Sequence, residues 1–187
     1  MKEKIEFFFD NYNYEFLLKE TILIVGHQKF LNFAIKSIKT QLSNDWTKSN
    51  NLFFIAQVDK NAVMLSNMNI QQNMILPLLF HKNYNETESQ KIINDLAELF
   101  DLKIYVNVFP ESLNIQQKKK YSIIRALSLQ PQIIIIDECS TFEQSEFLEI
   151  CKKINDMGIV VIATTEILTL ADYYKNIIII NEKICSH

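Results

Sequence analysis

The stretch LNIQQKKKYSIIRALSLQPQIIIIDE, which runs from Leu113 to Glu138, decides the fold of this chain. Its first half places Tyr121, Ile124 and Leu127 three residues apart, the spacing of one face of a helix. Its second half contains Ile133 to Ile136, an unbroken apolar run with the length and β-branched composition of a strand. The stretch therefore predicts a helix that leads into a strand.

The strand predicted at residues 133–136 ends in two adjacent carboxylates, Asp137 and Glu138. A run of four isoleucines predicts a strand covered on both faces, which is typical of a parallel sheet flanked by helices. Such sheets bind ligands at the carboxyl ends of their strands. In nucleotide hydrolases the first carboxylate holds Mg²⁺ and the second orients or deprotonates the attacking water. On these residues alone, an alternative stays open: the pair merely ends a strand and begins a turn.

The composition bounds the class of protein. The chain has 187 residues, 48% of them hydrophobic, which suffices for one domain with a buried core. The formal net charge of −3 indicates no broad nucleic-acid-binding surface, so we expect no nucleic-acid partner. No amino-terminal segment has the order of a signal peptide, and no apolar run approaches the roughly 20 residues that span a bilayer. We therefore expect a cytoplasmic protein.

Cysteine and glycine counts are also informative. The three cysteines lack CxxC spacing and a matching histidine cluster, so neither a zinc site nor a disulfide framework is predicted. The chain has only 2 glycines, Gly26 and Gly158, where average usage of about 7% predicts on the order of a dozen. A phosphate-binding loop that contains several glycines cannot be built from this supply.

Two segments of the sequence resemble the ABC-type ATPases. RALSLQPQIIIIDE, residues 125–138, is similar to the segment that joins the signature helix to the Walker B strand of that family. Gln57 and the run LSNMNIQQNMILPL, Leu65 to Leu78, resemble the Q-loop and the run that follows it. The pattern is nearest to small bacterial ATPases of lipid or lipoprotein traffic and of cell division. The matching residues of the first segment are Arg125, Ala126, Leu127, Pro131, Asp137 and Glu138.

This resemblance implies an α/β fold, a P-loop NTPase-like ABC ATPase core in which helices flank a mostly parallel sheet. It adds a short amino-terminal antiparallel β part and a helical subdomain. It implies a single domain over residues 1–187, with the core at about 1–60 and 130–187 and the helical subdomain at about 61–129. The cofactors would be ATP and Mg²⁺. The partners would be a second ATPase subunit and an integral-membrane permease, at the inner face of the cytoplasmic membrane.

The other elements are predicted from hydrophobic periodicity and turn residues. Strands are expected at residues 5–9, 12–18, 21–25, 52–56 and 159–163, with a closing pair at 176–180 and around 183–184. Helices are expected at residues 30–38, 70–79, 90–100, 147–154 and 169–174. We expect a polar connection at 43–51 and a solvated helix face at Lys118 to Lys120. We expect helix caps at Glu86, Ser89 and Gly158.

The predicted amino-terminal hairpin turns at residues 10 and 11. In the family the corresponding loop carries an aromatic residue that stacks on adenine, and this turn is too short to hold that loop. Tyr12 and Tyr14 are candidates for the same contact, but the alternation of a strand explains them as well.

The segment 21–33 has the order strand, glycine, helix that is typical of a P-loop. Laid without gaps on G-x-x-x-x-G-K-[ST], GHQKFLNF puts Gly26 at the first glycine and Leu31 at the second. Asn32 then replaces the phosphate-binding lysine, and Phe33 replaces the hydroxyl that ligates Mg²⁺. We therefore expect weak ATP binding at best.

The resemblance implies further site residues, of which the signature and the switch position are altered and the Q-loop and Walker B residues are retained. LNIQQ, residues 113–117, stands at the signature LSGGQ, with Asn114 for the serine and Gln117 for the glutamine. Thr165 stands at the switch histidine. Gln57 and Asp137 would hold Mg²⁺ if nucleotide binds, and Glu138 would be the residual catalytic carboxylate.

Three functions are compatible with the sequence. The first is a degenerate ABC subunit that dimerises, with itself or with another ABC ATPase, and docks on a permease with lost or weakened ATP hydrolysis. The second is a slow ATPase that retains the Walker B carboxylates and energises transport. The third is a soluble interaction module without a membrane partner.

Overall fold

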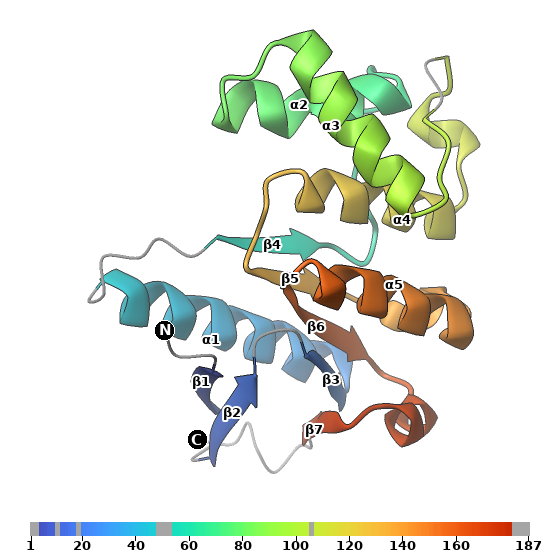
Figure 1. Cartoon of the computed structure of the whole chain (residues 1–187). Coiled ribbons are helices and arrows are strands. Elements are labelled where there is room, and N and C mark those ends of the chain that lie inside the picture. Colours follow the sequence, from blue (N-terminus) through green and yellow to red (C-terminus); the bar gives the residue numbers. More distant parts are fainter. Residues whose placement is uncertain (1–3, 10–11, 18–19, 48–53, 105–106, 181–187) are drawn as a thin grey trace. The chain divides into compact units, whose positions relative to one another are not determined.

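The computed structural model describes residues 4–9, 12–17, 20–47, 54–104 and 107–180 (Figure 1). The surroundings of side chains are described within residues 20–41, 54–104 and 107–180. The chain divides into two compact units, one formed by Met1–Ile55 with Gln132–His187 and the other by Ala56–Pro131. Each unit is described by itself.

The first unit is built on a parallel sheet. The strand order is β4-β5-β6-β3-β7, and β4 (Ile55–Val58) starts at the last residue of the unit's first segment. The other strands are β3 (Thr21–Gly26), β5 (Ile133–Ile136), β6 (Val160–Thr165) and β7 (Asn176–Ile180). β6 pairs in parallel with β3 and β5, and β7 pairs in parallel with β3. The predicted parallel sheet is confirmed.

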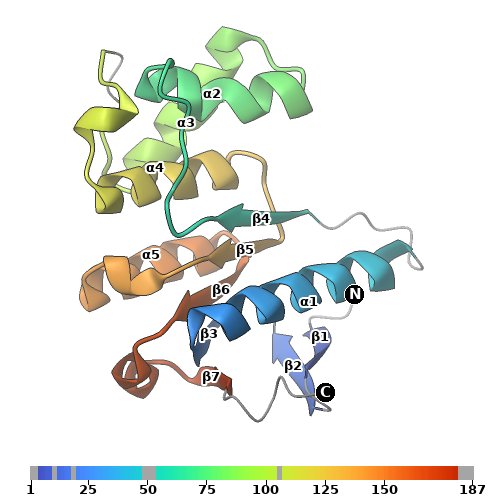
Figure 2. The same cartoon turned by 180° about the vertical axis from the view of Figure 1, so that it is seen from behind.

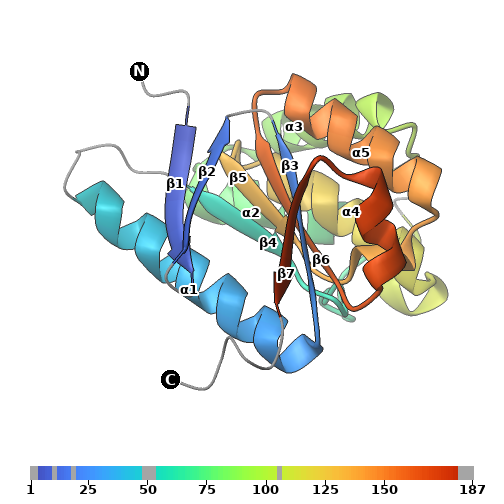
Figure 3. The same ribbon diagram turned by 90° about the horizontal axis from the view of Figure 1, so that it is seen from below.

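Burial explains why these segments form strands. All four isoleucines of β5 have no exposed surface, and every residue of β6 is buried. β-Branched side chains suit such doubly covered strands. α1 (Gln28–Thr47) runs along one face of the sheet (Figure 2), where Leu31, Ala34 and Ile38 join its core. α5 (Gln144–Asp156) covers the opposite face (Figure 3).

α1 is longer than the sequence pattern predicts. The periodicity predicts a helix at 30–38 followed by a polar connection, yet the helix continues to Thr47. Residues 28–47 contain no glycine or proline, so nothing in the backbone stops the helix where the apolar pattern fades. The expected connection at 43–51 is therefore wrong for its first part, and residues 48–51 lie outside the described residues.

The amino-terminal hairpin is confirmed. β1 (Lys4–Phe9) and β2 (Tyr12–Leu17) pair antiparallel, with Phe9 opposite Tyr12, and β1 contacts α1 (Figure 3). The turn at residues 10–11 and the side chains of Tyr12 and Tyr14 lie outside the described part of the chain.

The rest of the first unit consists of short connections. The 3₁₀ helix η2 (Cys139–Thr141) follows β5, and η3 (Leu168–Tyr173) lies at the predicted short helix. Gly158, with φ of 84°, follows α5 and confirms the predicted carboxyl-terminal cap. The partner predicted for β7 around residues 183–184 lies outside the described residues.

The second unit is helical. It contains α2 (Ile70–His81), α3 (Glu86–Leu99), the 3₁₀ helix η1 (Pro110–Ser112) and α4 (Ile115–Leu127). The three α-helices share a core to which Met74, Ile93 and Tyr121 belong. No helix in the described ranges is long and apolar enough to cross a membrane.

Each α-helix of the second unit begins with an asparagine capping box. The cap and its reciprocal partner are Asn69 with Gln72, Asn85 with Glu88, and Asn114 with Gln117. The predictions of a helix start near residue 90 and of caps at Glu86 and Ser89 are therefore wrong. Asn85 caps α3 and its box starts the helix at Glu86, while Ser89 is fully buried.

The expectation of a solvated helix face at Lys118 to Lys120 is wrong for Lys119. Lys119 has no exposed surface, while Lys118 and Lys120 are partly exposed. Lys119 shares its helix face with the buried Ser122 and Ile123, three and four residues later. The long aliphatic stem of lysine can pack on such a face.

Five non-glycine residues in the described ranges adopt positive φ. Their φ values lie between 47° and 55°, the left-handed region that is unfavourable for residues with a Cβ atom. They are Ala62, Asn83, Asp101, Gln130 and Glu138.

Candidate nucleotide-binding site

The candidate site of the first unit lies where three parallel strands end. Val25 of β3 pairs with Thr165 of β6, and Ile136 of β5 pairs with Ala163 of β6. The next residues along these strands are Gly26, Asp137 and Thr164, so all three lie at the same edge of the sheet. This is the edge at which open α/β sheets bind ligands.

Asp137 is held inside this edge. Its side chain is 4% exposed, and the hydroxyl of the fully buried Thr164 donates to its Oδ1 at 2.5 Å. The backbone N–H of Glu138 donates to the same threonine oxygen at 3.2 Å. A buried carboxylate is the ligand type that Mg²⁺ prefers. Within the described residues, however, no group of three or more histidine, cysteine, aspartate or glutamate side chains is arranged to hold a metal ion.

Glu138 occupies a strained backbone position. Its φ and ψ of 52° and 66° are left-handed, a conformation that clusters at functional sites and at tight turns. Its Oε1 accepts a hydrogen bond from the Ser140 hydroxyl and a longer one, 3.4 Å, from the Thr165 hydroxyl. The Glu138 carboxylate is thus held by the hydroxyl groups of Ser140, two residues later, and of Thr165 at the end of β6.

Thr165 lies at the end of β6 with no exposed surface. Besides its contact with Glu138, its hydroxyl accepts the backbone N–H of Ile167 at 3.1 Å. A hydroxyl in this place orients Glu138 and the following turn, but it lacks the ring nitrogen with which a histidine would bind a phosphate oxygen. Both described hydrogen bonds of the Thr165 hydroxyl are therefore made at this edge of the sheet and in the turn that follows β6.

Gly26 ends β3 in close contact with β7. A Cβ atom on Gly26 would lie 2.8 Å from the Ile180 carbonyl oxygen and 3.2 Å from the Ile180 Cβ atom. Close strand packing alone therefore requires a glycine here.

The helix after Gly26 starts earlier than the ungapped P-loop alignment assumes. α1 begins at Gln28, only two residues after Gly26, so Asn32 and Phe33 lie in its second turn. Asn32 Oδ1 accepts the side-chain amide of Gln28 at 3.0 Å, and the Phe33 side chain is 57% exposed. Leu31 faces the core with no exposed surface, and its burial fixes this register. The structure therefore does not place Asn32 and Phe33 at a helix N-terminus.

Glu166 lies at the N-terminus of α1 instead. The backbone N–H of Gln28 donates to Glu166 Oε1 at 2.6 Å. A hollow of about 280 Å³ beside this contact is lined by Gly26, His27, Phe30 and Glu166 among others. Ligand pockets usually measure about 300–1,000 Å³, so this hollow is small. Nothing in the sequence singles out Glu166 as a site residue, because its contact with Gln28 joins residues 138 positions apart.

The remaining predicted site residues belong to the second unit. Gln57 is an exposed residue of β4. Asn114 and Gln117 form the capping box of α4: Asn114 Oδ1 accepts the Gln117 N–H at 2.8 Å, and Gln117 Oε1 accepts the Asn114 N–H at 3.0 Å. Both side chains thus satisfy backbone groups at the start of their own helix.

The parallel sheet between helices, with Gly26 at the end of β3 and Asp137 at the end of β5 on either side of β6, defines a P-loop NTPase-like domain. No protein-family model matches the chain. In sequence it is 32% identical over 116 residues to the methionine import ATP-binding protein MetN of Wolinella succinogenes. It is 30% identical over 129 residues to the protein of the same name from Campylobacter jejuni. Each match covers 59% of this chain but only 38% of the relative.

Solved structures show the same architecture. CbiO1 from Clostridium perfringens, part of the ABC transporter complex CbiONQ, matches with a TM-score of 0.65 and 18% identity, over 90% of this chain and 76% of that chain. A dimeric bacterial ABC transporter cassette matches with a TM-score of 0.67 and 20% identity, over 91% and 84%. The chain is an ABC-type ATPase domain in fold, and its sequence is related to those of ABC ATP-binding proteins.

Proposed function

We propose that the chain is an ABC-transporter ATP-binding-type subunit in which nucleotide binding is lost or strongly weakened, while pairing and membrane docking are kept. The observation that carries the proposal is the start of α1. The helix begins two residues after Gly26, and the N–H of Gln28 is bonded to the Glu166 carboxylate.

The groups that normally hold phosphates are replaced by groups that do not. A P-loop surrounds phosphates with backbone N–H groups and a lysine. Here the connection between strand and helix is a single residue, His27, and a carboxylate lies at the helix N-terminus, where it repels a second anion. A charge-assisted phosphate contact is worth roughly 1.5–3 kcal/mol, so loss of the lysine alone weakens binding by about tenfold or more. ATP with Mg²⁺ does not fit these residues.

One observation favours the slow-ATPase alternative. Asp137 is buried and positioned by Thr164, and Glu138 follows it in a strained conformation. If these carboxylates retain chemistry, nucleotide must be held by groups other than a standard P-loop. Glu138 would then be the residual catalytic residue.

Calorimetric titration with ATP and Mg²⁺ separates the two functions. We expect no saturable heat from the wild-type chain at millimolar ATP. Saturable binding that disappears in Asp137→Ala would refute the proposal in favour of the slow ATPase. A Glu98→Ala variant, which changes an exposed carboxylate of α3, controls for net charge.

The proposed partner is an integral-membrane permease at the inner face of the cytoplasmic membrane, contacted by the second unit. CbiO1, which shares the fold, is part of a transporter complex. On α2 the side chain of Phe80 is 75% exposed, whereas Leu79 packs partly against the core. Phe80 is therefore a better probe of docking than Leu79.

Co-purification from membranes tests this contact. Phe80→Glu is expected to reduce recovery of a permease-like protein, whereas Leu168→Glu, at a 57% exposed apolar residue of η3, leaves it unchanged. Absence of any membrane protein from the wild-type purification would instead support an interaction module without a membrane partner. Sedimentation of the purified chain, alone and with a candidate ABC ATPase, distinguishes the homodimer from the heterodimer.

A further inference from the structure

A second cavity of the first unit lies at the amino ends of the strands. Its volume is about 500 Å³, within the usual range of ligand pockets. Thr21, the first residue of β3, and Asn176, the first residue of β7, line it. Because Gly26 ends β3, the cavity and the candidate nucleotide site lie at opposite ends of that strand.

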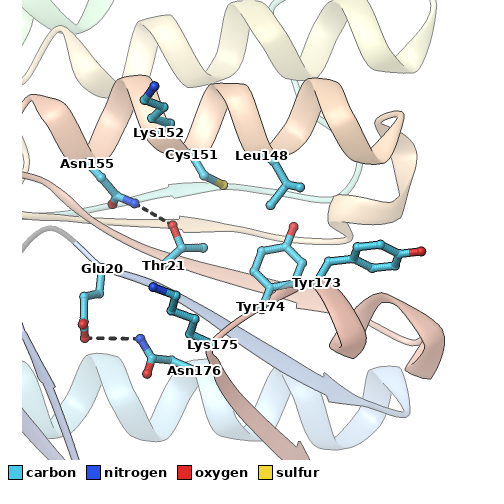
Figure 4. A pocket seen from close by; sticks show the side chains of 10 residues that line it. All are labelled: Glu20, Thr21, Leu148, Cys151, Lys152, Asn155, Tyr173, Tyr174, Lys175 and Asn176. Carbon is cyan, nitrogen blue, oxygen red and sulfur yellow. Dashed lines mark hydrogen bonds between the residues drawn. The ribbon is translucent and has the colours of Figure 1, made fainter.

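Two hydrogen bonds between distant segments fix the wall of the cavity (Figure 4). The Asn155 side-chain amide donates to the Thr21 hydroxyl at 2.8 Å, and the Asn176 amide donates to Glu20 Oε2 at 3.2 Å. These bonds join α5 and β7 to the start of β3, so the polar wall is formed before any ligand arrives.

Tyr174 places an unused donor in this cavity. Its ring is half-buried, and its hydroxyl points toward Leu148 of α5 (Figure 4). Within the described residues this hydroxyl has no hydrogen-bond partner. Burial raises the pKa of the phenol, and the nearby Cys151 and Cys139 act in the same direction, so the group stays protonated and donates.

The charged groups around the cavity favour an anion. Lys152 and Lys175 line it, and neither has an ion-pair partner among the residues that the structure describes. The opposing carboxylate, Glu20, already accepts the Asn176 amide. The Lys175 side chain extends along the cavity in the direction of Thr21, whereas Lys152 turns outward from α5 (Figure 4). Lys175 is therefore the cation best placed to contact a bound group.

We propose that this cavity binds a small organic anion, with its charged group on Lys175, an oxygen accepting from the Tyr174 hydroxyl, and its apolar part against Leu148. Both a carboxylate and a phosphate ester have this chemistry. The site does not depend on nucleotide binding at the other end of β3, so it can regulate or sense independently of ATP.

An NMR shift titration of the full chain tests the proposal, with phenylacetate and phenyl phosphate as anionic probes and phenylacetamide as the neutral match. We expect saturable shifts at the amides of Asn155, Tyr174 and Lys175, with a dissociation constant of roughly millimolar for probes of this size. The stronger of the two anions identifies the preferred headgroup. Phenylacetamide is expected to bind at least about threefold more weakly than phenylacetate.

Two variants test the residues. Lys175→Met and Tyr174→Phe are each expected to weaken binding about three- to tenfold, while Lys91→Met, which removes an exposed charge on α3, leaves it unchanged. The proposal is overturned if neither anion gives saturable shifts at these amides, if the neutral probe binds as well, or if Lys175→Met has no effect.

Discussion

Replacing Glu166 with glutamine removes a negative charge from the N-terminus of α1 while keeping the size of the side chain. A carboxylate near an exposed helix N-terminus typically contributes about 0.3–1 kcal/mol. The 2.6 Å bond to the Gln28 N–H is at the short end of charge-assisted hydrogen bonds, but Glu166 is exposed, so water competes for it. We expect Glu166→Gln to lower the free energy of unfolding by about 0.5–1 kcal/mol.

The assay is urea denaturation followed by circular dichroism, at low salt and at 1 M NaCl. Because salt screens exposed charges, the difference between wild type and Glu166→Gln should shrink at 1 M, where the Debye length is about 3 Å. Asp172→Asn, which makes the same charge change at an exposed position of η3, should alter stability by less than about 0.3 kcal/mol at either salt concentration.

If the Glu166→Gln variant is as stable as wild type at low salt, the negative charge of this carboxylate does not stabilise the N-terminus of α1, and the reasoning is refuted. A loss of equal size at both salt concentrations would instead attribute the effect to packing. The same variant in the ATP titration shows whether the carboxylate itself excludes nucleotide, because removal of the repelling charge would then restore measurable binding.

Three other perturbations test the structure. Asn73→Ala should lower the free energy of unfolding, measured in urea, by about 2–4 kcal/mol. The reason is that the fully buried Asn73 side chain accepts one backbone N–H at 2.8 Å and donates to three carbonyl groups. A loss below about 1 kcal/mol would contradict this reasoning. Gly26→Ala should destabilise it by about 1–3 kcal/mol, since the new Cβ atom meets β7 backbone at 2.8 Å, and an unchanged melting temperature would show that β7 shifts freely. In a Cys185→Ser background, Cys151 should resist thiol reagents at pH 8 until the protein unfolds, because burial raises its pKa; rapid labelling of the native state would argue against that burial.

The central strands could be predicted from sequence because a strand buried on both faces consists almost entirely of apolar, mostly β-branched residues. The isoleucine run of β5 and the apolar run of β6 are of this kind, and both are confirmed. Helix boundaries were harder to predict from the sequence. The apolar periodicity of α1 fades before the helix ends. The start of α3 is set by the Asn85 cap, and several other polar residues nearby in the sequence are equally suitable caps, so the sequence does not single out Asn85.

The candidate site was only partly predictable. Asp137 and Glu138 follow a clear strand signal, so their place at the strand end could be read from the chain. Glu166 could not be found in this way, since its contact with Gln28 depends on β3 and β6 lying side by side. The short connection between β3 and α1 could not be predicted either. An ungapped motif alignment assumes the loop length of a standard P-loop, whereas the true length depends on where the helix starts.

The left-handed non-glycine residues have a consequence for how this chain can change. Asparagine and aspartate tolerate this conformation, so the strain falls mainly on Ala62, Gln130 and Glu138. At roughly 1–2 kcal/mol each, these three take up a substantial share of the about 5–15 kcal/mol by which domains of this size are typically stable. Glycine at Gln130 would relieve part of that strain without touching the core. The chain thus has simple routes to greater robustness, which would let it tolerate further substitutions at its binding surfaces.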